Sequence, residues 1–399
     1  MFLIMRILRL FTGSIRPTRI IGPGVTFAGL LALIGAAVTG KIDFTKFDRL
    51  AELAASLDGS GLPGAAIAPV RLDPNASRST ERIRIATFNI QRFGEKKSGD
   101  AEVMQNLARI ISQFDLVAIQ EVQSPQAMPV ARLVDLLNRS GGRYDAAVSE
   151  PIGRTTYLEQ YAMVWDVTRI AMLPDSAYVV RDDSDRMHRP PMVASFETRI
   201  PSAMGRRPFR FTIISAHTDP NQVSPSGKSN EMDVLDDVFL RVREYEYQMR
   251  GLVNTLMVGD LNVSTANLGE LGQIPGMYSV VGTTPTNTLG TKTYDHILLD
   301  QTVTTEYTGV FGVVDYERDF GLSPEQASAI SDHRPVWAEF FAHEMPRSQP
   351  RTGRQGARRQ RSASDRRVRI RFGEPRRVDR HFRPPIESPT GDFPSETAR

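Results

Sequence analysis

The sequence predicts an α/β domain at residues 82–343, set between an apolar N-terminal segment and an arginine-rich tail. Two observations lead to this fold class. Short runs with the alternation or continuous apolarity of strands recur along this stretch, with amphipathic segments between them. The composition also changes sharply at both ends of the stretch, and a unit of this length fits one domain.

The individual elements follow from the apolar pattern. Strands are expected at residues 82–90, 115–122, 144–149, 162–165, 209–216, 252–258, 297–299 and 336–341, and helices at 101–113, 128–137 and 233–249. The strand at 115–122 is almost entirely apolar before its end, which predicts burial on both of its faces.

The N-terminal segment, residues 1–40, reads as a signal anchor or a signal peptide. Residues 20–38 are apolar and uncharged after four arginines, and their length is close to the roughly 20 residues that cross a bilayer. A retained anchor, a peptide cleaved near Ala36 and Ala37, and a buried core helix are the three alternatives, of which the length favours the anchor. Because positive residues stay on the cytoplasmic side, the domain would be membrane-anchored and extracytoplasmic, or secreted.

The two remaining flanking segments are predicted to lie outside the domain. Residues 41–81 read as a short amphipathic helix followed by a linker rich in Gly and Pro. Residues 344–399 hold fifteen Arg, no Lys and seven acidic residues, which gives this segment a net charge of +8. Because the whole chain has a net charge of +3, the remaining residues carry −5. We expect this tail to be disordered, and to bind nucleic-acid phosphates or to act as a solubilising or anionic-surface-binding segment.

Polar side chains recur at the ends of the predicted strands. They are Asn89, Glu121, His217, Asp260 with Asn262, Asp295, and Asp332 with His333. Glu121 is either a ligand for a divalent cation or one half of an ion pair with an arginine, because an unpaired buried carboxylate is costly. Glu159, just before another strand, either caps a turn or orients a histidine.

This set of residue types suits metal-assisted hydrolysis of a phosphodiester. It supplies carboxylates for a hard cation, two histidines for proton transfer and amides for phosphate oxygens. The chain has no cysteine, which excludes disulfides and thiolate sites, and it has no G-x-S-x-G, P-loop or H-E-x-x-H motif.

With these residues the chain resembles the endonuclease/exonuclease/phosphatase superfamily, and most of all its deoxyribonuclease I family. The stretches that carry the resemblance are 85–90, 119–122, 149–161, 215–217, 257–262, 293–295 and 329–333. The stretch 149–161 is the one particular to the deoxyribonuclease I family. The resemblance implies that residues 82–343 form a four-layer sandwich, with two β-sheets packed face to face and helices outside.

The resemblance also implies a divalent cation and a pair of proton-transfer groups. Glu121 and Asp332 would hold Mg²⁺ or Mn²⁺, with Asn89 nearby and Ca²⁺ as a further candidate. His217, oriented by Glu159, would protonate the leaving 3′ oxygen. His333, supported by Asp295, would act on the attacking water.

The remaining implied residues would meet the substrate. Asp260 and Asn262 would bind the phosphate region or a second metal, and Arg154, Tyr157 and Arg189 would contact the DNA backbone. The chain departs from the family's pattern at Gln91 and His296, where the family commonly has Arg, and in having no cysteine.

The predicted function is therefore that of a metal-dependent, non-specific DNA endonuclease. One alternative keeps the fold and replaces the substrate by lipid headgroups or sugar phosphates, as in sphingomyelinases. Another is a catalytically silent protein that binds DNA or a wall polymer. The expected partners are nucleic acid and, through the N-terminal helix, a membrane; we expect a monomer without a protein partner.

Overall fold

A computed structural model describes residues 68–345, except residues 125, 155–156, 200–204 and 224–229. The predicted anchor or signal peptide, the predicted helix at 41–60 and almost all of the arginine-rich tail lie outside these residues. In the part of the chain that the structure describes, no helix combines the length and the apolarity needed to cross a bilayer.

Within the described ranges, two mixed β-sheets form the centre of the domain. The first has six strands in the order β12-β13-β1-β2-β4-β3. Its strands are β1 (Arg82–Gly94), β2 (Leu116–Gln123), β3 (Tyr144–Val148), β4 (Gln160–Asp166), β12 (Tyr307–Val313) and β13 (Val336–Phe341). Only β1 and β2 run parallel in it; the other neighbours are antiparallel.

The second sheet has seven strands in the order β10-β11-β9-β8-β7-β5, with β6 paired to β7. Its strands are β5 (Ile170–Met172), β6 (Tyr178–Val179), β7 (Met192–Thr198), β8 (Arg210–His217), β9 (Asn254–Asp260), β10 (Met277–Ser279) and β11 (Asp295–Asp300). Here β8 and β9 are the parallel pair, so each sheet has a parallel centre whose strands end side by side.

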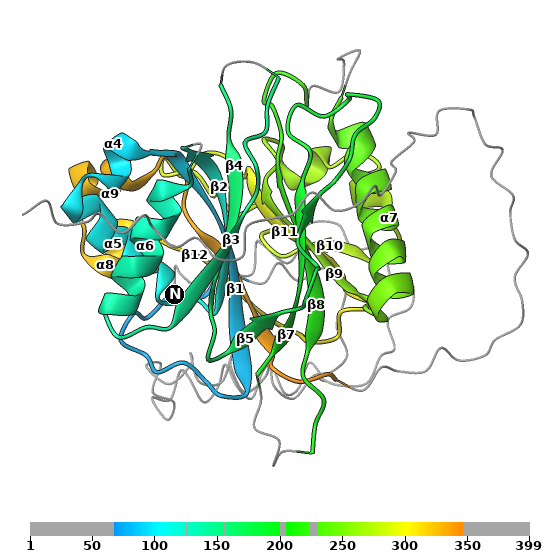
Figure 1. Cartoon of the computed structure of the whole chain (residues 1–399), viewed down its shortest axis with the longest axis horizontal. Coiled ribbons are helices and arrows are strands. Elements are labelled where there is room, and N and C mark those ends of the chain that lie inside the picture. The colour runs from blue at the N-terminus through cyan, green and yellow to red at the C-terminus, as the bar shows by residue number, and fades with distance from the viewer. Residues whose placement is uncertain (1–67, 125, 155–156, 200–204, 224–229, 346–399) are drawn as a thin grey trace, which may run out of the picture. The chain divides into compact units, whose positions relative to one another are not determined.

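The helices cover the outer faces of the two sheets. They are α4 (Glu95–Ser98), α5 (Ala101–Ile111), α6 (Met128–Arg139), α7 (Met232–Arg250), α8 (Tyr316–Phe320) and α9 (Pro324–Ile330), with short 3₁₀ turns at Thr265–Asn267 and Leu271–Gln273. Figure 1 shows α7 beside the second sheet and the others beside the first, so the described domain has the layers helix, sheet, sheet and helix.

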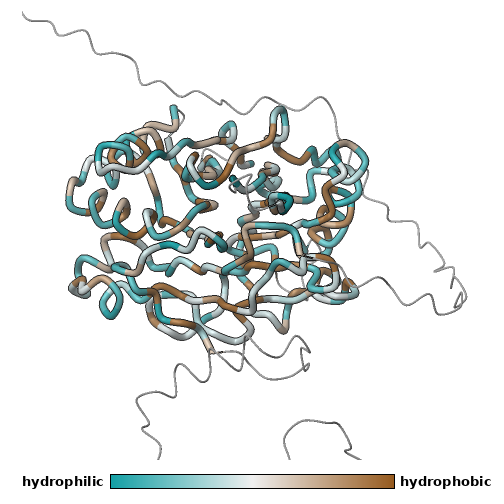
Figure 2. Tube along the Cα trace, turned by 90° about the horizontal axis from the view of Figure 1, so that it is seen from below, coloured by the Kyte–Doolittle hydropathy of each residue, from teal (hydrophilic) through white to brown (hydrophobic). Residues whose placement is uncertain are grey.

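Three apolar clusters hold these layers together. The middle one lies between the sheets and contains Trp165 and Phe196, whose rings meet edge to face at 5.6 Å between centroids. The outer two pack α5, α6 and α9 on the first sheet and α7 on the second. Apolar residues run along the strands and the helices that cover them, whereas the peripheral loops are mostly polar (Figure 2). Burial of one such large side chain contributes about 1.5–3 kcal/mol.

The strand β2 confirms the expectation of burial on both faces. Val117 and Ile119 belong to the helix-side cluster, and Leu116 and Ala118 belong to the cluster between the sheets. Because successive side chains of a strand point to opposite faces, only a nearly all-apolar sequence fits this position.

Irregular backbone at the ends of the central strands shapes the site. The pairing of β1 with β2 shifts register between Asn89 and Phe93, and Arg92 and Glu121 have positive φ angles of 49° and 63°. In β9, Gly259 lets the strand approach β8 closely, since a Cβ there would lie 1.8 Å from the Ala216 carbonyl oxygen.

Residues 68–81, expected to belong to a linker, pack on the domain. Leu72 is buried in the helix-side cluster, and Val70 donates its backbone N–H to the Phe311 carbonyl at 2.7 Å. The Arg78 guanidinium pairs with Asp115 at 3.0 Å and with Asp166 at 2.6 Å. The expected domain start at residue 82 is therefore too late. The strands β5, β6, β7, β10 and β12 and the helices α4, α8 and α9 were also not predicted.

Replacing Arg78 by Met should lower the free energy of unfolding at pH 7 by about 2 kcal/mol, because two buried carboxylates lose a partner. Burial raises the pKa of Asp166, but hydrogen bonds from Thr168 and Arg78 outweigh it and lower this pKa. A carboxyl group with a lowered folded pKa stabilises the fold above its unfolded pKa of about 3.9, and this contribution is lost as the pH falls further. The difference between the two proteins should therefore shrink below about pH 4.

Urea unfolding across this pH range measures both effects. The matched control is Arg139→Met, which breaks a surface pair with Asp135 at 3.6 Å, and it should change the unfolding free energy by less than about 0.5 kcal/mol. Equal losses in the two variants would contradict a structural role for Arg78.

Candidate active site

The carboxylate of Asp260, at the end of β9, is the centre of the site. It is 2% exposed, and its Oδ2 accepts a hydrogen bond from Asn89 Nδ2 on the other sheet at 3.0 Å. Its Oδ1 accepts the backbone N–H of Asn262 at 2.9 Å. Burial raises the pKa of Asp260, but the imidazoles of His333 and His217 and these hydrogen bonds outweigh it, so the pKa is lowered and the group is an anion.

The first histidine beside this anion is His217, the last residue of β8. Its Nε2 lies 3.8 Å from Asp260 Oδ2, and its Nδ1 lies 2.8 Å from Glu159 Oε2. Glu159 also accepts a bond from Arg189 Nη1 at 3.2 Å. Burial raises the pKa of Glu159, but His217 and Arg189 lower it more. The sequence left open whether Glu159 caps a turn or holds a histidine, and the contact is with the histidine.

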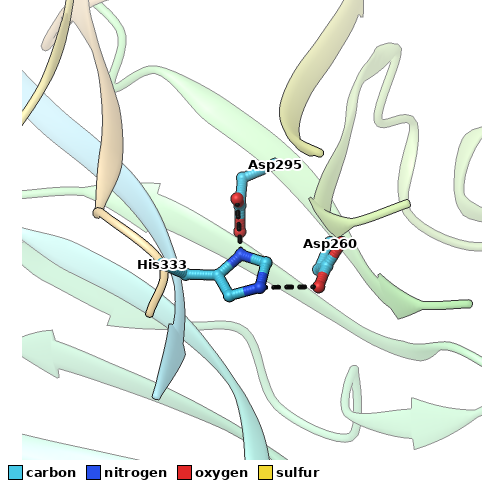
Figure 3. Close-up of side chains that lie close together, drawn as sticks. All are labelled: Asp260, Asp295 and His333. Carbon is cyan, nitrogen blue, oxygen red and sulfur yellow. Dashed lines mark hydrogen bonds and ion pairs between the residues drawn. The ribbon is translucent and has the colours of Figure 1, made fainter. Parts of the chain in front are cut away.

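The second histidine, His333, lies just before β13 and is placed between two carboxylates (Figure 3). Its Nδ1 is 2.8 Å from Asp295 Oδ2 and its Nε2 is 3.5 Å from Asp260 Oδ2. Asp295 is fully buried at the start of β11, and its Oδ2 also accepts the hydroxyl of Thr286 at 2.7 Å. Two histidines, each with its own carboxylate, thus converge on one oxygen.

The protonation of His333 follows from these neighbours. Burial lowers the pKa of His333, but Asp295, Asp260 and Asp332 raise it to about 11. The imidazole is therefore a cation at neutral pH, which donates to Asp295 and forms an ion pair with Asp260. Since a cation cannot accept a proton from water, a basic role needs an added positive charge in the site, which would lower this pKa.

Glu121 and Asn89 form the part of the site that suits a metal ion. Glu121 sits at the irregular end of β2, where its Oε1 accepts Asn89 Nδ2 at 3.0 Å and its Oε2 accepts the Arg92 backbone N–H at 2.9 Å. The Asn89 Oδ1 is buried and has no hydrogen-bond partner among the described residues. Carboxylate and amide oxygens are the ligands that hard divalent cations prefer.

Asp332 adds an exposed carboxylate next to this part of the site. Its Oδ2 accepts a bond from Gln91 Nε2 at 2.9 Å, and Gln91 adjoins the Arg92 that binds Glu121. The buried Ser331 hydroxyl donates to the Asn89 carbonyl at 2.7 Å and accepts the N–H groups of Gln91 and His333 at 3.1 Å. Ser331 therefore fixes the 331–333 segment to β1.

A second group with metal-ligand chemistry is Asp260, Asp295 and His333, whose nearest ligand atoms lie within 4.8 Å of one another. Both ring nitrogens of His333 face carboxylates here, and a protonated ring fits that arrangement. This geometry favours proton transfer over metal binding at these three residues. Glu121, Asn89 and Asp332 therefore fit a divalent cation better, because Asn89 Oδ1 has no partner among the described residues and the Asp332 carboxylate is exposed.

Contacts link nine of the predicted site residues into one network. They are Asn89, Glu121, Glu159, Arg189, His217, Asp260, Asn262, Asp295 and His333. Asn262 contributes its backbone N–H and also donates Nδ2 to the Thr218 carbonyl at 3.0 Å. The structure therefore brings these polar residues from the strand ends together, as expected.

The three residues expected on the DNA backbone differ in position. Arg189 is 8% exposed and donates to Glu159 and to the carbonyls of His217 and Thr218, so it supports the site from behind and is not placed to meet a phosphate. Arg154 pairs with Asp185 at 3.0 Å on a neighbouring loop. Tyr157 is 46% exposed, its hydroxyl accepts a hydrogen bond from Gln123 Nε2, and its pKa is raised by burial and by Glu121 and Glu159.

Sequence reasoning missed several residues that position the site. They are Gln91, Lys97, Tyr161, Thr286 and Ser331. Lys97 donates to the Ile330 carbonyl at 2.6 Å, and burial lowers its pKa to about 8 against the opposing effect of Glu121 and Asp332. The only sequence signal for these residues was a place in the same motif as Asn89, Glu159 or Asp332. Gln91, Tyr161 and Ser331 have this signal, whereas Lys97 and Thr286 do not.

Comparison with known proteins gives a consistent result. Residues 86–333 match the model of the Endonuclease/Exonuclease/phosphatase family. Deoxyribonuclease-1 of Sus scrofa is 33% identical over 275 residues, covering 64% of this chain and 90% of that protein. Deoxyribonuclease-1-like 1 of Chlorocebus aethiops is 30% identical over 282 residues, covering 68% and 88%, and human Deoxyribonuclease-1 is 31% identical over 280 residues, covering 64% and 90%.

Replacing Asp295 by Asn should lower the pKa of His333, because it removes the largest of the negative charges that raise it. With EDTA present, the His333 imidazole of the unchanged protein should stay protonated from pH 6 to pH 9, and in the variant it should titrate at a lower pH. Ring ¹⁵N shifts measure this directly. His343, whose pKa is lowered by burial and by Arg206, is the internal control and should titrate alike in both proteins. Titration of His333 near pH 6.5 in the unchanged protein would contradict the assignment.

Proposed function

Because the chain belongs to the endonuclease/exonuclease/phosphatase family and is deoxyribonuclease I-like, we propose that it is a divalent-metal-dependent endonuclease acting on DNA. As a member of this family it is a hydrolytic phosphodiesterase. DNA as the substrate is the proposal, and its support is the identity of about 30% to proteins named deoxyribonucleases over some 90% of their length.

One geometric observation carries the proposed chemistry. His217 Nε2 and His333 Nε2 lie 3.8 and 3.5 Å from the same Asp260 oxygen, so two proton-transfer groups face one small region. Hydrolysis of a phosphodiester needs a proton taken from the attacking water and a proton given to the leaving oxygen. Water adds to phosphorus, the bond to the 3′ oxygen breaks, and the products are a 3′ hydroxyl and a 5′ phosphate.

The two histidines are suited to different halves of this reaction. His217 would protonate the leaving 3′ oxygen, and Glu159 with Arg189 fixes the orientation of its ring. His333 would act on the water, with Asp295 holding its Nδ1. Asp260 stabilises positive charge on either ring, and Asn262, bonded to Asp260 through its backbone N–H, would meet a phosphate oxygen.

A divalent cation, Mg²⁺ or Mn²⁺ in our proposal, would be held by Glu121 and Asp332, with the unpartnered Oδ1 of Asn89 as a further oxygen. When bound, it supplies positive charge that polarises the phosphate and offsets the charge of the transition state. Ca²⁺ prefers the same oxygen ligands and remains a second candidate ion.

The two ends of the chain add to the proposal on the basis of sequence alone. The uncharged apolar residues 20–38 behind four arginines support a domain that works outside the cytosol, membrane-anchored or secreted. The fifteen arginines of residues 344–399 would add sequence-independent affinity for phosphates, which weakens steeply as salt is raised.

Replacing His217 by Ala should reduce the rate of plasmid nicking with Mg²⁺ by roughly 10²–10⁴-fold, because it removes a general acid. The matched control is His343→Ala, a histidine near the C-terminal end of the described domain that bonds to Arg206, and it should nick at the unchanged rate. Sphingomyelin and sugar phosphates, tested beside the plasmid, distinguish the alternative substrates. Nicking by His217→Ala at full speed would refute the acid role, and turnover of sphingomyelin without nicking would refute the DNA substrate.

Replacing Glu121 by Gln or Asp332 by Asn should weaken Mn²⁺ binding by about 10-fold or more, since each change removes an anionic ligand. Electron paramagnetic resonance of Mn²⁺ measures this without any turnover. Glu339→Gln is the control, because Glu339 pairs with Arg82 at the other end of β1. If Asp295→Asn loses Mn²⁺ binding and the other two variants keep it, the ion must instead be assigned to the cluster of Asp260, Asp295 and His333.

A further inference from the structure

The backbone of His333 is held by side chains and not by a helix or a strand. It belongs to the irregular segment 331–335, which lies between the end of α9 and the start of β13. Its N–H donates to the Ser331 hydroxyl at 3.1 Å, and its carbonyl accepts the hydroxyl of Tyr316 at 2.6 Å. Among the described residues these are the hydrogen bonds of the His333 backbone, so two hydroxyl groups determine where its ring is placed.

The tyrosine bond is one of three successive contacts between this segment and the start of α8. Next to it, Asp315 Oδ2 pairs with Nη1 of Arg334 at 3.1 Å. One residue further along each chain, the Val314 N–H donates to the Pro335 carbonyl at 2.9 Å. Residues 314–316 therefore run along the residues that follow the histidine ring and bond to each of them in turn. A shift of this part of the catalytic segment would have to break three contacts together.

The helix α8 is itself firmly held, although it has only five residues. Asp315 caps it, because its Oδ1 accepts the Arg318 N–H at 2.9 Å and its own N–H donates to Asp319 Oδ2 at 2.9 Å. From outside the helix, Arg71 Nη2 donates to the Arg318 carbonyl at 2.8 Å, and its Nε lies 3.3 Å from Asp319 Oδ1. The start of α8 is thus a fixed support for the segment that it contacts.

The hydroxyl of Tyr316 has no packing role of its own. The side chain is 1% exposed in the helix-side cluster, with its ring 6.4 Å from that of Phe88. Burial raises the pKa of Tyr316 well above its usual range, and Asp295 and Asp332 raise it further, so the hydroxyl stays protonated and donates. A phenylalanine would fill the same apolar space. The hydroxyl is therefore needed for the His333 carbonyl and not for the core.

We propose that Tyr316 is a positioning residue, which holds the carbonyl of His333 and thereby fixes the imidazole between Asp295 and Asp260. The inference rests on the proposed function, because it takes His333 as the group that acts on the attacking water. The ring has Nδ1 at 2.8 Å from one carboxylate and Nε2 at 3.5 Å from the other, and a rotation of the peptide after His333 would disturb both contacts. A misplacement of about 1 Å can reduce a rate by roughly 10²-fold.

Replacing Tyr316 by Phe tests this role on plasmid DNA and on bis(4-nitrophenyl) phosphate, both with Mg²⁺. The value of kcat should fall about 10-fold on each substrate and KM should stay within about twofold, because the change affects the reacting geometry and not binding. In a protein that already carries His333→Ala, the same replacement should have no further effect on kcat, since the group that it positions is gone. A merely structural tyrosine would lower the rate in both backgrounds.

A second variant and a control make the test independent of one substitution. Asp315→Asn keeps a good helix cap and removes the charge that pairs with Arg334, so kcat should fall about 3-fold, again only when His333 is present. The matched control is Tyr144→Phe, because Tyr144 is also buried and its hydroxyl lies 3.4 Å from the Phe114 carbonyl at the opposite end of the first sheet. This control should change neither kcat nor KM.

The possible outcomes separate this inference from the proposed function. An unchanged kcat in Tyr316→Phe would overturn the inference, and so would an equal loss with and without His333. Full activity of His333→Ala would remove His333 from the proposed mechanism, and the inference would fail with it. Hydrolysis of the small diester without plasmid nicking would refute DNA as the substrate, and the comparison of Tyr316→Phe in the two backgrounds on the diester would then decide the inference.

Discussion

The buried carboxylate of Asp260 is the constraint on which the geometry of the site depends. An anion that is 2% exposed must be surrounded by donors and positive charge, because its burial is otherwise costly. Both sheets contribute: Asn89 on β1 and Asn262 just after β9 donate hydrogen bonds to it, and the His217 ring at the end of β8 lies 3.8 Å away. The apolar layer between the sheets must therefore bring the ends of their parallel strands together, and the close approach of β8 and β9 at Gly259 is part of that requirement.

This shared anion links two histidines whose surroundings differ. Glu159 keeps a lowered pKa because Arg189 and His217 both favour its charged form, so it remains an acceptor that fixes the ring of His217. Burial raises the pKa of Asp295 more than its contacts with His333 and Thr286 lower it. The His333 side of the site is thus the more sensitive to added charge, and it is also the side where Asp332 meets Glu121 through Gln91 and Arg92. An arrangement with one fixed proton donor and one charge-sensitive group suits a reaction with two proton transfers.

Much of this site could be predicted from sequence because the signal is local. Polar residues at the ends of apolar strands must share an edge of the sheet when the strands are parallel neighbours, which is how Asn89, Glu121, His217 and Asp260 were found. The role of Arg189 could not be predicted in this way. Arg189, Glu159 and His217 lie on three separate segments of the chain, which come together only in the folded domain. The positive φ of Glu121 has no local sequence signature either, and β12 and β7 escaped prediction because they lack simple alternation. Ser331 was visible within the Asp332–His333 motif, but its bonds to β1 depend on long-range contacts.

The centre and the rim of the site obey different physical requirements. At the centre, most polar side-chain atoms have a partner among the described residues, with Asn89 Oδ1 and Asp295 Oδ1 as exceptions, so replacing one residue leaves a buried group unpaired. The turn at residues 287–290 is fixed by its own hydrogen bonds and by its contacts with Asp332 and His333, and the Leu289 side chain at its tip is 82% exposed and so under no packing constraint. Residues such as Leu289, Tyr157 and Arg154 can therefore vary while the reaction at the histidines stays the same. Family membership consequently determines the chemistry more firmly than it determines the shape of the substrate, and the exposed loops are where the preference of this chain for one phosphodiester over another must originate.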